Sequence, residues 1–199
     1  VTGSAISTKR PSASRTRPRR GTGGCEPSQA SSNHERVVGD APCQVRLDGC
    51  HADFDRPLND RGIRAADRMA DWLLDQQLCP DHVISSPAAR ARATALAVVS
   101  CCSTDNHQVE FEQRAYLADA FTWLQLVASQ QPGRTMICGH NPGLDDLVDH
   151  LSASPVPLSD SGKRMTTAAV AHFRFDTSWN ELDQGSCELV QLVRPRELV

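Results

Sequence analysis

A histidine follows a short apolar run at a point where the chain is expected to turn sharply. The run Thr135-Met136-Ile137-Cys138 leads into Gly139-His140-Asn141-Pro142-Gly143-Leu144. An apolar run that ends at an Asn-Pro-Gly breaker before a helical pattern is typical of a strand-to-helix corner. In α/β sheets such corners lie at the carboxyl ends of the strands, where ligands bind. His140 is therefore a candidate binding or catalytic residue, and a histidine packed at a strand end is the plain alternative.

An arginine is placed in a similar way after a second apolar run. His82-Val83-Ile84 is followed by Ser85-Ser86-Pro87-Ala88-Ala89-Arg90-Ala91, where a proline breaker precedes a helical pattern of small residues. A planar guanidinium binds two phosphate oxygens at once, and the start of a helix attracts anions. Arg90 is therefore a candidate anion ligand, with a solvated helix face as the alternative. Arg92, two positions on, is expected on the surface.

A third segment precedes the first helical pattern. Asp53-Phe54-Asp55-Arg56-Pro57-Leu58-Asn59-Asp60-Arg61-Gly62 places Arg56 before a proline that starts a turn. Taken in chain order, the three segments resemble the histidine phosphatase superfamily, and most closely its small SixA-type phosphohistidine phosphatase branch. The resemblance extends from about Ala52 to the C-terminus.

The resemblance implies a phosphoryl-transfer site and a role for each of three residues. Such transfer leaves charge on three oxygens, so it needs fixed cationic donors and an in-line nucleophile. Arg90 matches the arginine of the family's Ser-Pro-x-x-Arg-Ala segment, and His140 matches a histidine that hydrogen-bonds the transferring group. These two are the predicted catalytic residues. Arg56 matches an arginine that helps to bind phosphate near the mouth of the site.

A carboxylic general acid, which larger members of the superfamily use, has no convincing match. Glu110 and Glu112 fall near the corresponding region. The SixA-type branch manages without a dedicated acid, because an imidazole leaving group departs after simple protonation. No metal or organic cofactor is implied, since cationic side chains stabilise the charge.

The family's nucleophile is missing from this chain. The family opens with a strand that ends in Arg-His-Gly or Arg-His-Ala, and this histidine attacks phosphorus. Counting back from Asp55 places the opening where the sequence reads Ala41-Pro42-Cys43-Gln44-Val45. His34 and His51 are expected to be surface histidines. The first strand is therefore expected to be missing or replaced, for example by Cys43 to Leu47, and the protein is expected to be inactive or impaired.

The genetic code suggests an origin for this gap. Read one nucleotide later, the codons of Asp40 to Val45 permit Met-Arg-His-Ala-Lys-Ser, and those of Arg36 to Gly39 permit an apolar strand. A Ser-, Arg-, Pro- and Gly-rich opening is what shifted reading of GC-rich DNA commonly produces. Two hypotheses stay open: residues 1 to about 50 are out of frame relative to a functional ancestor, or they are a genuine, divergent N-terminus. The histidine requires the codon CCA at Pro42.

Composition limits the domain organisation. The chain has 199 residues and a net charge of -3, so one domain is expected and a general polyanion binder is not. Residues 1–36 are basic and lack apolar periodicity, so they are expected to form a disordered tail. A nucleic-acid arm, a transit peptide and out-of-frame translation are the competing interpretations of this tail. Residues 37–199 are expected to form the histidine-phosphatase-like domain.

The cysteines and the apolar content bear on location and partners. Eight cysteines are scattered without a CxxC pair, which favours reduced thiols in a cytoplasmic protein over a disulfide framework. Cys43, Cys50 and His51 lack a fourth zinc ligand at a recognisable spacing. No stretch approaches the roughly 18 apolar residues of a membrane span. The expected partner is a phosphorylated substrate, with a phosphohistidine protein as one candidate; no membrane or nucleic-acid partner is expected, and the chain is expected to be a monomer.

Alternating helical and strand patterns begin at residue 60. Helices are expected at about 60–77, 88–100, 121–127 and 144–151, and strands at 83–84, 109–111 and 135–138. Two late apolar runs, 168–175 and 187–193, are expected to form an antiparallel pair at one edge. This order predicts an α/β three-layer sandwich with a mainly parallel sheet. The resemblance implies a phosphoglycerate-mutase-like fold.

Overall fold

A computed structural model describes residues 34–40, 53–102, 108–130 and 133–198 of the chain. Within these residues, six strands form one sheet in the order β3-β2-β4-β1-β5-β6. The strands are β1 (His34–Asp40), β2 (His82–Ser85), β3 (Gln108–Phe111), β4 (Thr135–Gly139), β5 (Val170–Phe175) and β6 (Glu188–Val193). The helices are α1 (Asp60–Asp75), α2 (Ala89–Cys102), α3 (Ala120–Val127) and α4 (Gly143–Leu151), with short 3-10 turns η1 (Asp53–Asp55), η2 (Gln113–Ala115) and η3 (Trp179–Glu181).

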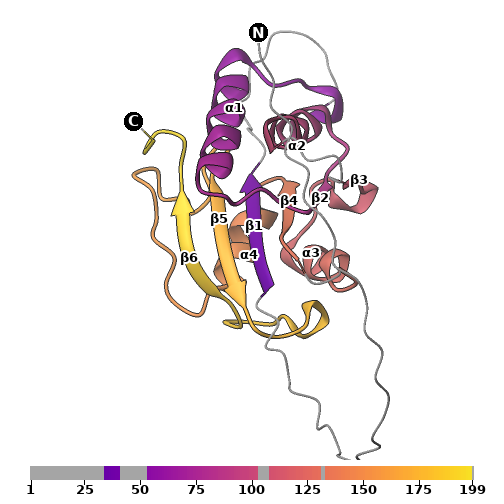
Figure 1. The fold of residues 1–199 in the computed structure, drawn as a ribbon, viewed down its shortest axis with the longest axis vertical. Helices are drawn as coiled ribbons and strands as arrows, with labels where there is room; N and C mark the ends of the chain where they lie inside the picture. The colour runs from indigo at the N-terminus through magenta and orange to yellow at the C-terminus, as the bar shows by residue number, and fades with distance from the viewer. Residues whose placement is uncertain (1–33, 41–52, 103–107, 131–132, 199) are drawn as a thin grey trace, which may run out of the picture. The chain divides into compact units, whose positions relative to one another are not determined.

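The middle of the sheet is formed by β4 and β1. β1 pairs in parallel with β4 and antiparallel with β5, and β2 is parallel to both β3 and β4. β6 pairs antiparallel with β5, and Figure 1 shows β1, β5 and β6 side by side. The predicted mainly parallel sheet with an antiparallel pair at one edge is thus confirmed.

Alternating side chains on the inner strands separate the helices into two layers. Val83 and Met136 belong to a core that contains residues of α1 and α2. Ile84 and Ile137, the next residues along the same strands, belong to a core that contains residues of α3 and α4. All four side chains are at most 1% exposed. Because successive strand residues point to opposite faces, helices cover both faces of the sheet, and the three-layer sandwich is confirmed.

Local signals explain where two of the helices begin. The Asn59 side chain accepts a hydrogen bond of 2.8 Å from the backbone N–H of Gly62 at the start of α1. The Asp119 carboxylate accepts one of 2.7 Å from the N–H of Thr122 at the start of α3. Both are preferred N-cap residues, since their side chains satisfy backbone donors that the helix leaves free.

β1 fills the place of the first strand, which the sequence left open as missing or replaced. It begins at His34, within the last residues of the predicted tail. The sequence of β1 contains only two adjacent apolar residues, Val37 and Val38, and its strand conformation comes from backbone pairing on both sides. The suggested replacement, Cys43 to Leu47, lies outside the described residues, as do residues 1–33 and His51.

A disulfide bond joins Cys79 to Cys102. The prediction of reduced thiols is therefore wrong for this pair, whereas Cys101, Cys138 and Cys187 form no disulfide bond among the described residues. Cys79 follows α1 and Cys102 ends α2, so the packing of these two helices brings together residues that are 23 positions apart. The cytoplasmic location was expected because the thiols were predicted to be reduced. This disulfide removes that argument, since disulfides persist mainly in oxidising compartments.

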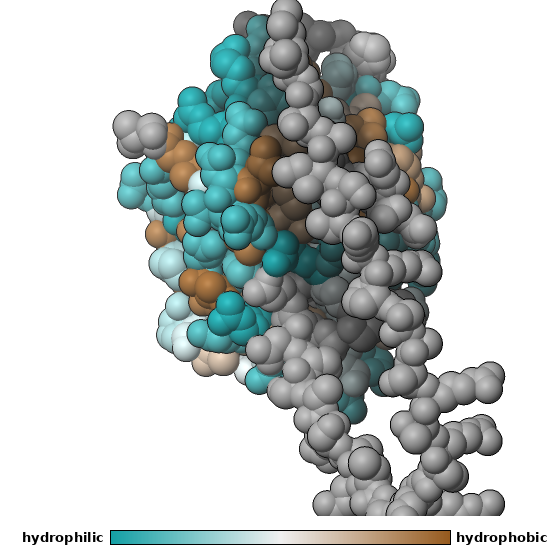
Figure 2. Space-filling model, in the orientation of Figure 1, coloured by the Kyte–Doolittle hydropathy of each residue, from teal (hydrophilic) through white to brown (hydrophobic). Residues whose placement is uncertain are grey.

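The described surface is mixed in character. On the face seen in Figure 2, hydrophilic residues predominate and hydrophobic residues lie in patches between them, as is usual for folded domains. Among the described helices, none combines the length and the apolarity that crossing a bilayer requires.

Candidate functional site

Three parallel strands end at the same edge of the sheet. Asp40 of β1 lies opposite Gly139 of β4, and Ser85 of β2 lies opposite Cys138 of β4. His140 follows Gly139 directly. Residues that follow these strands are therefore placed close together, as the sequence pattern predicts for a ligand site.

Two glycines allow the chain to pack closely on either side of His140. A Cβ atom at Gly139 would lie 2.5 Å from Cζ2 of the buried Trp123 ring. A Cβ atom at Gly143 would overlap the carbonyl oxygen of Ala118. His140 lies between these contacts and is 2% exposed, so its ring is held by the close packing of the corner.

Arg90 is the second residue of α2 and is only 2% exposed. Its Nη1 donates to the backbone oxygen of Asp53 (2.5 Å) and its Nη2 to the Asp53 carboxylate (2.8 Å). The Nε atom is buried and has no hydrogen-bond partner among the described residues. Asp53 thus occupies the terminal nitrogens of the guanidinium, and the Nε–H donor is left for another acceptor.

The Asp53 carboxylate also links Arg90 to two further side chains. Arg56 Nη2 lies 3.1 Å from its Oδ1, and the Tyr116 hydroxyl donates to its Oδ2 over 3.1 Å. The Tyr116 ring stands edge-on to the His140 ring, with 5.5 Å between the centroids. These five residues are called the Arg90 cluster below.

The pKa values in the Arg90 cluster follow from these contacts. Burial raises the pKa of the Asp53 carboxyl, but hydrogen bonds from Arg90 and Tyr116, with the charges of Arg90 and Arg56, lower it overall. Burial and the hydrogen bond to Asp53 raise the pKa of Tyr116. At neutral pH Asp53 is therefore a carboxylate and Tyr116 a protonated donor.

His140 is neutral at physiological pH. Burial, and next the positive charge of Arg90, lower its pKa to about 4. Its Nε2 lies 2.9 Å from the hydroxyl oxygen of Ser86. Its Nδ1 is buried and has no hydrogen-bond partner among the described residues.

The Arg90 cluster carries one net positive charge, from two guanidinium groups and one carboxylate. The start of α2 adds the positive end of a helix dipole beside Arg90. Buried cationic donors at a helix start, together with a neutral imidazole, can bind an oxyanion and stabilise charge that develops on it.

The structure brings together the three residues singled out from the sequence. Arg90 and His140 both follow strands that end at this edge, and Arg56 joins them through Asp53. Sequence reasoning missed the roles of Asp53 and Tyr116. Asp53 lies three positions before Arg56 in the segment that precedes α1, but Tyr116 lies 63 positions from Asp53, and no local pattern connects the two.

Other side chains considered from the sequence are engaged elsewhere. Glu110 lies 3.7 Å from His82, and Glu112 lies 3.3 Å from Arg114. Neither contact involves the Arg90 cluster. Arg92 is exposed, as predicted. Within the described residues, no group of three or more His, Cys, Asp and Glu side chains could hold a metal ion.

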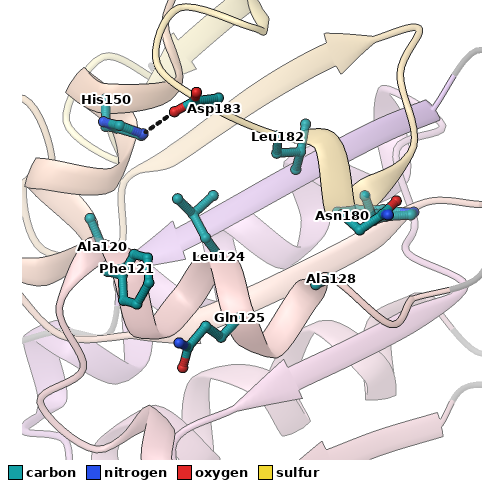
Figure 3. A pocket seen from close by; sticks show the side chains of 10 residues that line it. Ala120, Phe121, Leu124, Gln125, Ala128, His150, Asn180, Leu182 and Asp183 are labelled. Carbon is teal, nitrogen blue, oxygen red and sulfur yellow. Dashed lines mark ion pairs between the residues drawn. The ribbon is translucent and has the colours of Figure 1, made fainter.

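A cavity of about 420 Å³ is lined by His150, near the end of α4 (Figure 3), whereas His140 precedes the start of that helix. Its described walls come from α3, the end of α4 and the segment around η3, and include Leu124, Ala128 and Leu182. His150 lies 3.7 Å from the Asp183 carboxylate at its rim. No residue of the Arg90 cluster lines this mainly apolar cavity, so it is separate from the candidate anion site.

Comparison with known proteins shows a family similarity. The sequence matches the histidine phosphatase superfamily (branch 1) over residues 45–117, a range that contains Asp53, Arg56, Arg90 and Tyr116. This part of the chain is similar to the histidine phosphatase superfamily. The resemblance noted from the sequence is thereby confirmed at the level of the superfamily.

Two similar sequences come from mycobacteria. An uncharacterized protein of Mycobacterium leprae (strain TN) is 28% identical over 151 residues, which cover 73% of this chain and 90% of that protein. An uncharacterized protein of Mycobacterium tuberculosis (strain H37Rv) is also 28% identical over 151 residues, with 73% and 92% covered.

Solved structures with a similar fold include SixA proteins. SixA of Nakamurella multipartitia has a TM-score of 0.68 and 24% identity, covering 82% of this chain and 96% of that one. The protein histidine phosphatase SixA complexed with tungstate has a TM-score of 0.66 and 22% identity, covering 83% and 99%. A phosphoserine phosphatase mutant of Entamoeba histolytica in complex with phosphoserine has a TM-score of 0.58 and 13% identity, covering 83% and 100%. These similarities confirm the phosphoglycerate-mutase-like fold.

Proposed function

We propose that this chain is a phosphohistidine phosphatase homologue that binds a phosphoryl group at the Arg90 cluster and, with the sequence it has, hydrolyses phosphate compounds negligibly. Its substrate class is a phosphorylated molecule, with a phosphohistidine protein as the candidate that the SixA-like fold favours. Arg90 and His140 hold the transferring group, and Arg56 helps to attract it. No metal or organic cofactor takes part, because these side chains supply the charge.

One observation carries the binding part of the proposal. Two side chains that are each 2% exposed, Arg90 and His140, leave ring or guanidinium nitrogens without a partner among the described residues. A buried polar atom left unpaired costs about 1–3 kcal/mol. A phosphoryl group has three oxygens able to accept from such donors, and the cluster's net positive charge favours an anion over a neutral ligand. The tungstate complex of a SixA protein supports the same class of ligand.

The proposal of negligible hydrolysis depends on the absence of a nucleophile. In this family a histidine attacks phosphorus, so an N–P bond forms while the bond to the leaving group breaks and that group takes a proton. Water then cleaves the N–P bond, releasing phosphate and restoring the imidazole. In this sequence, Ala41 and Pro42 follow β1, and neither carries a nucleophilic side chain.

Binding is tested by titrating the full chain with inorganic phosphate and with tungstate in a calorimeter. Arg90→Gln should weaken binding by at least about tenfold, because it removes a charge-assisted donor set. Arg56→Gln, at a residue that is 18% exposed, should have a smaller effect. Arg92→Gln is the matched control, since Arg92 lies on the surface of the same helix. Equal losses in the Arg90 and Arg92 variants, or no binding by the parent chain, would contradict the proposed site.

Activity is tested with an aryl phosphate and with phosphohistidine. The parent chain should show no more than background hydrolysis, because losing a nucleophile costs up to about 10⁶ in rate. Activity should be gained when an apolar strand replaces residues 36–39 together with Ala41→Arg, Pro42→His, Cys43→Ala, Gln44→Lys and Val45→Ser. Parent activity that His34→Ala or His51→Ala abolishes would show that the nucleophile lies elsewhere.

Two alternatives lead to different results. A phosphate-binding module without any catalytic ancestor predicts binding, but no gain of activity in the restored variant. A nucleic-acid-associated protein predicts salt-dependent binding that deletion of residues 1–36 removes. Those residues include the basic segment, most of which lies outside the described part of the chain. The monomeric state and the cytoplasmic location stay predictions.

A further inference from the structure

We infer that Ser86 is a positioning residue for His140: its hydroxyl donates to Nε2 and so keeps the ring proton on Nδ1, which donates to an oxygen of the bound phosphoryl group. The phosphoryl contact rests on the proposed function. The position of the ring proton does not, because it follows from contacts within the chain.

The two side chains meet in a rigid and dry place. The Ser86 hydroxyl oxygen lies 2.9 Å from Nε2 of His140, and the residues are 0% and 2% exposed. The backbone N–H of Ser86 donates to the Cys138 carbonyl over 2.9 Å. Ser86 is therefore fixed where β2 and β4 end, which limits the positions its hydroxyl can take.

The other contacts of the Ser86 hydroxyl favour it as the donor in the Ser86–His140 hydrogen bond. The N–H of Ala88 donates to the Ser86 hydroxyl oxygen over 3.3 Å, and a backbone N–H can only donate. The hydroxyl has one proton of its own. Among the described residues, His140 Nε2 is the acceptor within reach of that proton. An Nε2 that accepts is unprotonated, so the single proton of the neutral ring lies on Nδ1.

The groups around the ring keep it neutral, so the ring carries a single proton, on either Nδ1 or Nε2. Burial and the charges of Arg90 and Arg56 disfavour a second proton, and the Asp53 carboxylate opposes them with a smaller effect than burial and Arg90. The Tyr116 ring covers one side, edge-on at 5.5 Å. Nδ1–H is thus a buried donor without an acceptor in the described part of the chain, and it belongs to the same cluster as the unpaired Nε–H of Arg90. A phosphoryl oxygen would supply the acceptor.

The tautomer is measured directly by long-range proton–nitrogen NMR of the full chain at about pH 7, with His140 assigned by comparison with His140→Gln. The parent chain should show the Nδ1–H tautomer. Ser86→Ala should lose this preference and bind inorganic phosphate about fivefold more weakly, the value of one hydrogen bond. Ser86→Thr, which keeps a hydroxyl, should restore both properties.

Ser85→Ala is the matched control, because Ser85 is equally buried and hydrogen-bonded but does not contact the ring. It should leave the tautomer and the phosphate affinity unchanged. An Nε2–H tautomer in the parent chain would overturn the inference even if no variant folded. An unchanged tautomer in a folded Ser86→Ala variant would overturn it as well. If the tautomer behaves as expected and the parent chain does not bind phosphate, the proposed function fails while the Ser86–His140 hydrogen bond stands.

Discussion

The pKa of His140 makes a quantitative prediction for stability between about pH 6.5 and pH 4. In the folded chain, burial and the charge of Arg90 lower this pKa from 6.5 to about 4. In the unfolded chain the ring is exposed and has its ordinary pKa. As the pH falls through 6.5, the unfolded state takes up a proton that the folded state does not, so the free energy of unfolding decreases. Below about 4 both states are protonated and the loss from this residue ends.

The size of the effect follows from the difference between the two pKa values. Each pKa unit corresponds to about 1.4 kcal/mol, so His140 alone removes up to about 3 kcal/mol across this range. Folded domains are commonly stable by only about 5–15 kcal/mol, so the change should be large enough to measure. Asp53 contributes in a lower range: its pKa is lowered in the folded state, and its stabilisation is lost as the pH falls below the ordinary carboxyl value.

Urea unfolding of the parent chain and of His140→Gln at several pH values isolates the contribution of the ring. The carboxyl groups are common to both proteins, so their contributions cancel in the difference. The advantage of the parent chain should decrease steadily from about pH 6.5 to pH 4. An NMR titration should also place the His140 pKa well below 6.5. A difference in stability that does not vary with pH, or a His140 pKa near 6.5, would refute the argument from burial.

Two further predictions concern packing and cross-linking. Cys79→Ser should lower the free energy of unfolding by about 3 kcal/mol and Tm by roughly 6–12 °C, given the 23-residue separation of Cys79 and Cys102. Cys101→Ser is the control and should change Tm little. An unchanged Tm after confirmed reduction of the disulfide would contradict this prediction. Gly143→Ala should lower the free energy of unfolding by about 1–3 kcal/mol or more, because its Cβ would overlap the Ala118 carbonyl oxygen. A thermal unfolding curve that matches the parent chain would contradict this, because it would show that the turn between β4 and α4 can relax.

Periodicity in the sequence was sufficient to predict most of the helices and strands. In α1, residues such as Ala66, Met69 and Leu73 recur on one face, and all three are buried. The short strands before Ser86 and His140 were visible as apolar runs bounded by breakers. Parallel strands end at a common edge, so it could also be predicted that side chains after those runs would meet.

Contacts between distant segments could not be predicted in this way. Tyr116 reaches Asp53 only because the fold brings a turn after β3 against the turn before α1. Cys79 and Cys102 are paired because α1 and α2 pack together, which no cysteine spacing indicates. β1 was missed because its sequence, His-Glu-Arg-Val-Val-Gly-Asp, lacks the apolar run that marks an inner strand of a parallel sheet. Its strand conformation depends on pairing with β4 and β5, which lie far along the chain.

The register of β1 bears on the hypothesis that the N-terminal segment is out of frame. Asp40, the last residue of β1, lies opposite Gly139, the last residue of β4. Positions 41 and 42 therefore come directly after β1, just as His140 and Asn141 come directly after β4. Counting back from Asp55 with the family's spacing, which uses no information about pairing, places the absent Arg-His at the same two positions. The shifted reading also gives an apolar sequence to residues 36–39, which the middle of this sheet requires and the present sequence does not supply. If the N-terminus were genuine and divergent, the neighbouring reading frame would not be expected to encode both an apolar strand and the Arg-His motif at the matching positions. The nucleotide sequence decides between the two, because any codon other than CCA at Pro42 excludes the histidine.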